Sequence, residues 1–333
     1  MASPKDKVLS DTDYILFLIG SPNDVSCTEA SRCSHHPDSP AHDSFYRLLE
    51  SLSTDTLTLW QDAEPMVDKT GGALVLDDST LDKPHAQRTG LVTHHGSGKH
   101  RAVVKGINLL TLLWTDGDAK IPCDLRLYDT SGKTKNDHFR EMLDEAKRRG
   151  MSPRFVLFDG WYSSLKNLKH IRDLGWYWLT RFKDNRQVAP GDHRNVPLSS
   201  LDIPADGLEV HLRGYGFIRV FVTTNPDGEK EYWATNDLTL NEKKRQKWAA
   251  ASWAIEVYHR GLKQTCNVER CQARRTSLQR GHILASVRAF LRLEWRRLKE
   301  EVSWYETKRS IVREAVRTFL ANPSVPRHLA LGA

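Results

Sequence analysis

RFVLFDGWYSSLKNLKHIRDLGWYWLTRF, residues 154–182, reads as a strand, a helix and a second strand. The apolar run at 155–158 is typical of a buried strand, and it ends on Asp159. The segment after it has helical spacing and stops at Gly175, and the next strand follows at once. Strands that alternate with helices indicate an α/β fold.

Three more elements precede this unit. GGALVLDD at 71–78 is a glycine pair followed by an apolar run, which predicts a buried strand. Residues 99–129 hold two β-rich runs separated by the turn signal TDGD, so they predict a hairpin. Residues 133–150 predict a helix that buries Phe139, Met142, Leu143 and Ala146 on one face. The predicted order is β-β-β-α-β-α-β.

The chain after this unit changes its pattern twice. Residues 185–236 alternate in polarity and contain the turn NPDG, which predicts a separate β-rich insert. Residues 240–270 predict one long helix, and 278–300 predict a second helix. The first helix is expected to bury Trp248, Ala251, Ile255, Tyr258 and Leu262, and the second Leu284, Val287, Leu291 and Leu298.

Four parts are therefore expected along the chain. A helical N-terminal module, which we expect to bind DNA or support assembly, covers residues 1–69. The α/β core covers 70–184 and 237–300 and is interrupted by the β-strand insert at 185–236, and a C-terminal helix and tail follow at 301–333.

Composition narrows the class of partner. The 333 residues include 49 Lys and Arg against 42 Asp and Glu, a formal net charge of +7, which favours a polyanion such as nucleic acid. The apolar runs are too short to span a bilayer, and the N-terminus lacks a signal peptide, so we expect no membrane partner. Five cysteines without framework spacing favour a reducing compartment, so a cytoplasmic location is expected.

Three acids stand out by their positions. Asp77 and Asp159 follow apolar strands, where side chains leave the sheet toward a cleft, although either could also be a turn residue that caps backbone amides. Glu256, Arg260 and Lys263 are spaced i, i+4 and i+7 on one helical stripe, which alternatively forms a solvated ion pair. Aromatic neighbours on that helix favour a packed cleft.

Three carboxylates without a Cys and His cluster predict Mg²⁺ or Mn²⁺ over zinc. Two such ions about 3.5–4 Å apart support in-line phosphoryl displacement, which suits a basic protein. A phosphate-binding loop is excluded near Gly132, because Leu127 occupies the place of its first glycine, and no nucleotide cofactor is expected.

These acids lie in three segments that together resemble one family. DDSTLDKPHA at 77–86, VLFDGWYSSLKNL at 156–168 and WAIEVYHRGLKQ at 253–264 resemble DDE-type insertion-sequence transposases of the cut-and-paste subgroup. The resemblance implies a ribonuclease H-like core with a mixed sheet, interrupted by a β-strand insertion domain before the catalytic glutamate. It also implies that Asp77, Asp159 and Glu256 form the metal-binding catalytic triad.

Further roles follow from the same resemblance. Lys263 holds the place of a lysine that contacts phosphate near the scissile bond, and Trp233 resembles a tryptophan that stacks on a flipped base, with a core role as the equal alternative. The subgroup's tyrosine and arginine are replaced by Ala249 and Ser252. His259 and Arg260 could take over in holding the DNA backbone, although solvation of the helix explains them equally well.

The choice between Asp77 and its neighbour Asp78 rests on strand geometry. Only one of two adjacent strand residues faces a given side of the sheet. The family pattern of an acid, any residue and Ser or Thr fits Asp77, Asp78 and Ser79. We therefore assign Asp77 to the triad.

The C-terminal helices add a candidate phosphate-binding stripe. Arg288 and Arg292 lead a basic row opposite the buried leucines, and this row is expected to contact DNA or to be a solvated helix face.

The function predicted from these observations is a DNA transposase, an endonuclease that cleaves the ends of an insertion sequence and transfers the strands into target DNA with two Mg²⁺ or Mn²⁺ ions. The expected partners are double-stranded DNA at element ends and target, and at least one more copy of the chain, in the cytoplasm at the bacterial nucleoid. Two alternatives stay open, a ribonuclease H-like nuclease without strand transfer and a decayed transposase that only binds DNA.

Overall fold

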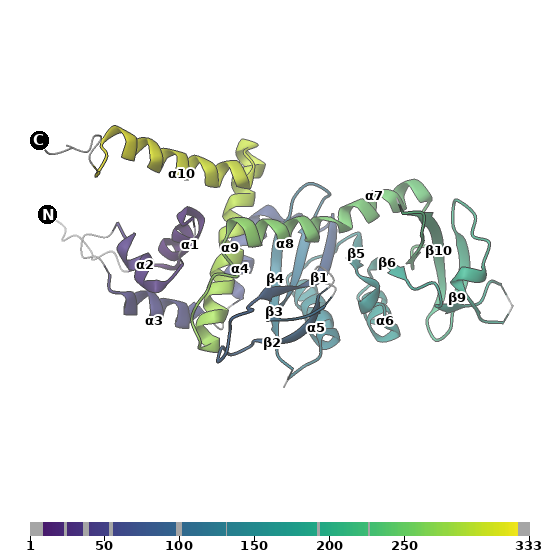
Figure 1. Ribbon diagram of the computed structural model, residues 1–333. Coiled ribbons are helices and arrows are strands. Elements are labelled where there is room, and N and C mark those ends of the chain that lie inside the picture. The colour runs from purple at the N-terminus through teal and green to yellow at the C-terminus, as the bar shows by residue number, and fades with distance from the viewer. Residues whose placement is uncertain are drawn as a thin grey trace, which may run out of the picture. The chain divides into compact units, whose positions relative to one another are not determined.

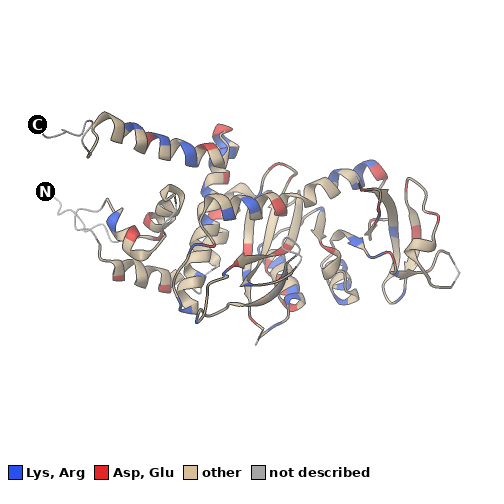
Figure 2. Cartoon of the chain, in the orientation of Figure 1, with Lys and Arg blue, Asp and Glu red and all other residues tan. Residues whose placement is uncertain are grey.

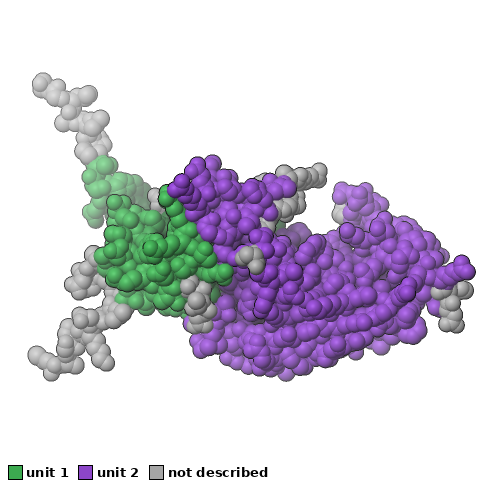
Figure 3. Space-filling model, turned by 90° about the horizontal axis from the view of Figure 1, so that it is seen from below, with its two compact units in different colours: residues 1–55, 260–333 green, residues 56–259 purple. Residues whose placement is uncertain are grey.

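The computed structural model describes residues 9–22, 25–35, 40–52, 56–97, 102–130, 132–191, 194–225 and 227–325. The chain forms two compact units, which Figure 3 colours separately. One unit contains residues 1–55 and 260–333, and the other contains residues 56–259. Each is described by itself.

A single large mixed sheet organises the unit of residues 56–259 (Figure 1). Its described strands are β1 (Ala73–Asp82), β2 (Thr93–Ser97), β3 (Ala102–Thr115), β4 (Ile121–Tyr128), β5 (Phe155–Phe158), β6 (Tyr177–Phe182), β9 (Leu208–Leu212), β10 (Gly216–Thr224) and β11 (Lys230–Thr235). They pair in the order β2-β3-β1-β5-β6-β11-β10-β9, and β4 pairs with β3 beside this path.

The central strands carry the topology that the sequence predicts. β3 is antiparallel to β1 and to β4, while β5 is parallel to both β1 and β6. The parallel steps need crossover helices, which are α5 (Lys135–Arg148) between β4 and β5 and α6 (Leu165–Asp173) between β5 and β6. The order β-β-β-α-β-α-β is confirmed, with β2 as an additional short strand.

The insert corrects one expectation, because it is not a separate β structure. β11 pairs antiparallel with β6, so that Trp233 lies opposite Arg181 and the hairpin of β10 and β11 extends the central sheet. A β6 left at the edge would expose a row of unpaired backbone groups, and β11 covers them. Only β7 (Gln187–Val188) and β8 (Val196–Pro197) form a second small sheet among the described residues.

Helices cover both faces of the central sheet. Neighbouring residues on β5 point to opposite faces. Phe155 contacts Trp248 of α7 (Glu242–Ser252), with ring centroids 5.2 Å apart, while Phe158 contacts Phe139 of α5, with centroids also 5.2 Å apart. Helix α4 (Leu57–Ala63), which η1 (Glu64–Met66) follows, packs against β4. The acids described below lie on the face of the sheet that α7 covers.

The helix predicted over 240–270 is interrupted, which is a second correction. α7 ends at Ser252 and α8 (Ala254–Thr265) begins after Trp253. The Ser252 hydroxyl donates a hydrogen bond to the carbonyl of Ala249 at 2.6 Å, and such side-chain bonds to the preceding turn bend helices. Trp253 is left 58% exposed at the junction.

The other unit is helical. It contains α1 (Asp11–Gly20), α2 (Cys27–Arg32), α3 (His42–Leu52), α9 (Thr276–Glu300) and α10 (Trp304–Ala321). α9 packs against α1 and α3, and Gly281 allows this approach because a Cβ there would clash with the backbone of Leu49. Of the leucines expected to be buried on α9, Leu298 is exposed at 36%, so this part of the prediction is wrong.

These units are not the four parts expected from the sequence. Helix α4 belongs with the sheet, although it was expected in the N-terminal module, and α9 packs with α1 and α3. Compactness does not assign a role to a segment, so the functional division at residues 69, 185, 237 and 300 stays a prediction. Within the described part of the chain, no helix has the length and apolar character needed to cross a bilayer.

Candidate active site

The register of β1 and β5 brings two acids to the same level of the sheet. Leu76 lies opposite Phe158 on these parallel strands, so Asp77, within β1, comes level with Asp159, the residue directly after β5. By alternation both point to the face that α7 covers, because Asp159 has the same parity as Phe155. The expectation that both acids end a strand holds for Asp159 and is wrong for Asp77, because β1 continues to Asp82.

A single pocket on this face collects the third acid. Glu256, in the first turn of α8, lines it together with Asp77 and Asp159. The remaining lining residues include the insert tryptophan and the junction between α7 and α8; they are Val75, Leu76, Phe158, Arg181, Trp233, Ser252, Trp253 and Ile255. All belong to the unit of residues 56–259. Three carboxylates that are distant in sequence thus share one concave surface.

The electrostatics of this pocket are uncompensated. Burial raises the pKa of Asp77 well above its usual range, and the nearby charges of Asp78, Glu256 and Asp159 raise it further. The pocket lining contains one basic side chain, Arg181, against three acids. Asp159 and Glu256 are exposed, so the cost of burial falls on Asp77. A buried carboxylate beside like charges is unfavourable unless a cation neutralises it.

The donor set fits a hard divalent cation. Carboxylate oxygens are the ligands that Mg²⁺ and Mn²⁺ prefer, and a cation would favour the ionised form of Asp77, which burial and then the neighbouring acids disfavour. The acids do not form a preassembled site: among the described residues, no three His, Cys, Asp or Glu side chains are grouped so that they could hold a metal ion. The fit therefore rests on donor chemistry and charge.

Asp78 lies in a different environment from Asp77. Its carboxylate accepts hydrogen bonds from Lys135 Nζ at 2.7 Å, from the Tyr162 hydroxyl at 2.6 Å and from Asn108 Nδ2 at 2.6 Å. Burial alone would raise the pKa of Asp78, but Lys135 and these hydrogen bonds outweigh it and lower the pKa. Alternation sends its side chain to the α5 face, away from the pocket.

Comparison with known proteins identifies the family. Residues 69–291 match the profile of the transposase DDE domain, which is more than half of the chain. The chain belongs to the DDE transposase family. No curated protein sequence matches it.

One solved structure supports the fold of this DNA transposase. A piggyBac transposase synaptic complex with hairpin DNA is 14% identical with a TM-score of 0.51, over 95% of this chain and 73% of that one. The Mos1 strand transfer complex also matches, with 9% identity and a TM-score of 0.20, over 53% of this chain and 59% of that one. The Drosophila P element transposase strand transfer complex matches with 9% identity and a TM-score of 0.24, over 97% of this chain and 88% of that one. The ribonuclease H-like fold predicted from the sequence is confirmed.

The other predicted site residues of the transposase are distributed more widely. Trp233 lines the acidic pocket and is partly exposed, so it is not a core residue. His259 is only 5% exposed, which contradicts the expectation that it meets the DNA backbone. Arg260 and Lys263 follow on α8 in the unit of residues 260–333; Arg260 is exposed, and Lys263 pairs with Glu269 at 3.3 Å.

The basic stripe on α9 needs a correction. Arg288 is 5% exposed and forms an ion pair with Asp11 of α1, so it secures the helical unit and is not on the surface. Arg292 is half-buried and donates to the carbonyl of Arg288 at 3.2 Å. The spacing of the arginines predicted that they share one face of α9, but α1 covers the part of that face that carries Arg288. Lysines and arginines also lie along α7 and α10 (Figure 2).

Sequence reasoning missed Arg181, the basic residue in the pocket. It follows Thr180, which lies opposite Phe158, so Arg181 leaves β6 at the level of Asp159. Its guanidinium pairs with Glu231 at 2.9 Å and lies 5.8 Å from the ring centroid of Trp233. A signal was available, because Arg181 is a charged residue near the end of an apolar strand, as Asp159 directly follows one.

Proposed function

We propose that this transposase cleaves DNA at the ends of its mobile element and joins the freed strands to target DNA in the pocket of Asp77, Asp159 and Glu256. The observation that carries the proposal is the convergence of these three carboxylates, from the middle of β1, the end of β5 and the first turn of α8, on one pocket that also contains Trp233 and Arg181. An ion pair on a solvated helix face would not place Glu256 beside the other two acids.

The three acids would hold divalent cations, with Mg²⁺ or Mn²⁺ as the ions and two per site as the stoichiometry. Bound there, such ions activate a nucleophilic oxygen and stabilise the leaving oxygen in phosphoryl transfer. The protein's own contribution is position: the parallel pairing of β1 and β5 sets Asp77 beside Asp159, and α8 presents Glu256 to both. Enzymes of this family use divalent metal ions, which supports the assignment.

Arg181 is the residue that we propose to contact a DNA phosphate in this pocket. A phosphodiester carries a negative charge that three carboxylates would repel, so a cation is needed beside them. The Arg181 side chain is 51% exposed, and its guanidinium presents several donors in a fixed geometry suited to phosphate. Ser252, which replaces the family's arginine, lines the same pocket without a charge. Lys263 and Arg260 are proposed to hold phosphates further along α8.

Trp233 is proposed to stack on a base turned out of the duplex. Its ring lies in the pocket wall and is bordered by the guanidinium groups of Arg181 and Arg245, whose carbons lie 5.8 and 5.5 Å from the ring centroid. An aromatic face of this kind binds bases without sequence preference. A base turned out of a duplex implies double-stranded DNA as the proposed substrate. Synapsis of two DNA ends would require at least two copies of the chain. Arg292 is a further candidate for a DNA contact.

Two assays on short duplexes of the element end test the proposal. With Mn²⁺, wild-type protein is expected to nick the duplex, and with pre-cut ends it is expected to join them to a target plasmid. Asp159→Asn is the control: it is expected to bind the duplex and to lose both activities by a factor of at least ~10³.

The outcomes separate the alternatives. Nicking without joining would identify a nuclease of the same fold, and binding without nicking would identify a DNA-binding remnant. Undiminished nicking by Asp159→Asn would refute the assignment of the site.

A further inference from the structure

A buried polar cluster lies behind the proposed active site, on the opposite face of β1. Asp78 is its centre and receives three hydrogen bonds, from Lys135, Tyr162 and Asn108. The side chains of Lys135 and Asp78 are 19% and 21% exposed, and Tyr162 and Asn108 are 1% exposed. None of these residues lines the pocket, and the activity described so far does not use them.

Tyr162 connects this cluster to the turn that carries Asp159. It ends η2 (Gly160–Tyr162), which starts directly after Asp159, and its backbone N–H donates to the Asp159 carbonyl at 2.9 Å. Its hydroxyl donates to Asp78 at 2.6 Å. Since Asp78 adjoins Asp77 in β1, one side chain joins the backbone segments that carry two of the three acids.

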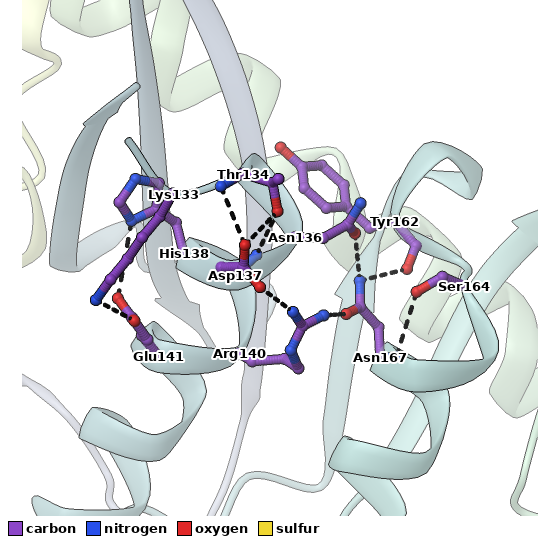
Figure 4. A network of polar contacts seen from close by, with 10 residues as sticks. All are labelled: Lys133, Thr134, Asn136, Asp137, His138, Arg140, Glu141, Tyr162, Ser164 and Asn167. Carbon is purple, nitrogen blue, oxygen red and sulfur yellow. Dashed lines mark hydrogen bonds and ion pairs between the residues drawn. The ribbon is translucent and has the colours of Figure 1, made fainter. Parts of the chain in front are cut away.

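The ring of Tyr162 is itself fixed. It stacks on Phe139 with centroids 5.3 Å apart and meets the edge of Trp161 at 4.7 Å. Its carbonyl accepts a hydrogen bond from Asn167 Nδ2 at 2.9 Å, and Asn167 in turn bonds to Asn136 at 2.6 Å. Figure 4 shows Asn167 between Tyr162 and the first turn of α5.

The first turn of α5 anchors this support. Arg140 donates to Asn167 Oδ1 at 2.5 Å and pairs with Asp137, which caps the helix through Thr134 (Figure 4). Helices α5 and α6 are therefore joined to the tyrosine through a network whose polar groups are largely satisfied, and such networks rigidify a buried region. The turn after β5 has little freedom to move relative to β1.

We propose that Asp78 and Tyr162 are positioning residues that fix the separation of Asp77 and Asp159 for divalent cations. This inference rests on the proposed function of the pocket. Lys135 balances the charge of Asp78, so the connection holds the strand ends together without a second uncompensated acid. Residues that orient metal ligands from behind in this way affect metal affinity about 10–100-fold when they are changed.

The test is Tyr162→Phe in the full chain, with binding of Mn²⁺ alone followed by electron paramagnetic resonance of the free ion. The variant keeps the ring contacts and removes only the hydroxyl. We expect Mn²⁺ affinity to fall about 10–100-fold, and strand cleavage to recover largely when Mn²⁺ is raised to saturation. A purely structural role would lower the thermal midpoint and leave the affinity of the folded protein unchanged.

Tyr215→Phe is the matched control. Its hydroxyl is also hydrogen-bonded inside the same unit, accepting from Trp178 Nε1 at 2.9 Å, but it does not contact the pocket or the cluster. Its Mn²⁺ affinity is expected to equal that of the wild type. If Tyr162→Phe does not fold, Asp78→Asn, which removes the negative charge that strengthens the bonds from Tyr162 and Lys135, is expected to show a loss of affinity in the same direction.

Two results would overturn the inference, and they are distinguishable. Wild-type protein that binds no Mn²⁺ would remove the proposed metal site and the inference with it. Wild-type binding that neither Tyr162→Phe nor Asp78→Asn weakens would leave the site in place and refute only the positioning role.

Discussion

Asp77 and Asp78 are neighbours in β1, yet the protein treats their charges in opposite ways. Asp78 faces α5 and is neutralised by Lys135 and two further hydrogen-bond donors, which lower its pKa. Asp77 faces the pocket, where burial and the charges of Asp78, Glu256 and Asp159 raise its pKa. On one side of β1 the carboxylate is neutralised by protein groups, and on the other side we propose that a bound cation neutralises it.

The difference shows how a structural acid and a functional acid can be told apart in one short motif. A carboxylate that serves the fold has its partners within the protein, because an unpaired buried charge is costly. A carboxylate that serves a bound cation lacks them, and the fold bears the cost until the ligand arrives. The contrast leads to four predictions.

The largest expected effect is on cleavage. Asp77→Asn should lower the rate of strand cleavage by at least ~10³-fold, because it removes a proposed metal ligand, while Asp78→Asn should lower it about 10–100-fold. Single-turnover cleavage of an end duplex at fixed Mn²⁺ measures both. Equal losses in the two variants would mean that the two faces do not differ in function.

A smaller effect is expected at the pocket's basic residue. Arg181→Gln should slow cleavage about 10–150-fold, since a hydrogen bond to a charged group contributes about 1.5–3 kcal/mol. Arg154→Gln is the control, because Arg154 is similarly exposed, at 53%, and pairs with Asp237 at 3.0 Å outside the pocket. Its cleavage rate should match the wild type. Full activity of Arg181→Gln would exclude a phosphate contact there.

Stability should change in opposite directions on the two faces. Without divalent cations at pH 8, Asp77→Asn should raise the thermal midpoint, because it removes like-charge repulsion, and Asp78→Asn should lower stability by about 1–3 kcal/mol. Each kcal/mol corresponds to about 2–4 °C for a unit of this size. Thermal unfolding followed by circular dichroism would show it, and shifts of the same sign would contradict the comparison.

The smallest effect is the pH dependence of these shifts. The folded-state pKa of Asp77 is raised, so its ionised form costs stability above that pKa, and the gain from Asp77→Asn should fade as pH falls toward about 4. The pKa of Asp78 is lowered, so its contribution should persist until pH falls below about 4. Between pH 8 and pH 4 the midpoint of Asp77→Asn should converge on that of the wild type, while the midpoint of Asp78→Asn should stay below it by a constant difference. An Asp77→Asn curve that runs parallel to the wild-type curve would contradict the comparison.

The central fold could be predicted because its signals are local. The apolar runs before Asp77 and Asp159 mark buried strands, and the helix stops at Gly150 and Gly175 are real: both glycines have positive φ, 79° and 81°. The pairing of β11 with β6 could not be predicted, because strand pairing is a long-range contact and the alternating pattern of the insert suits any antiparallel partner.

The candidate site was predictable in its acids and less so in its basic residues. Strand alternation indicated that only one of Asp77 and Asp78 faces the pocket, and the family pattern indicated which. The burial of Arg288 and His259 depends on which elements pack over them, and sequence spacing along a helix does not contain that information. Arg181 escaped notice because its importance comes from its level beside Asp159 on another strand.

The continuity of the sheet from β5 through β6 to β11 has a mechanical consequence. Trp233 and Arg181 lie opposite each other in the hydrogen-bonded ladder of β6 and β11, and β6 pairs with β5, which ends directly before Asp159. The backbone at these positions therefore cannot shift toward a substrate without breaking main-chain hydrogen bonds, and only side-chain rotation is left to adjust the pocket wall. If a base stacks on Trp233 as proposed, most of the movement has to come from the duplex.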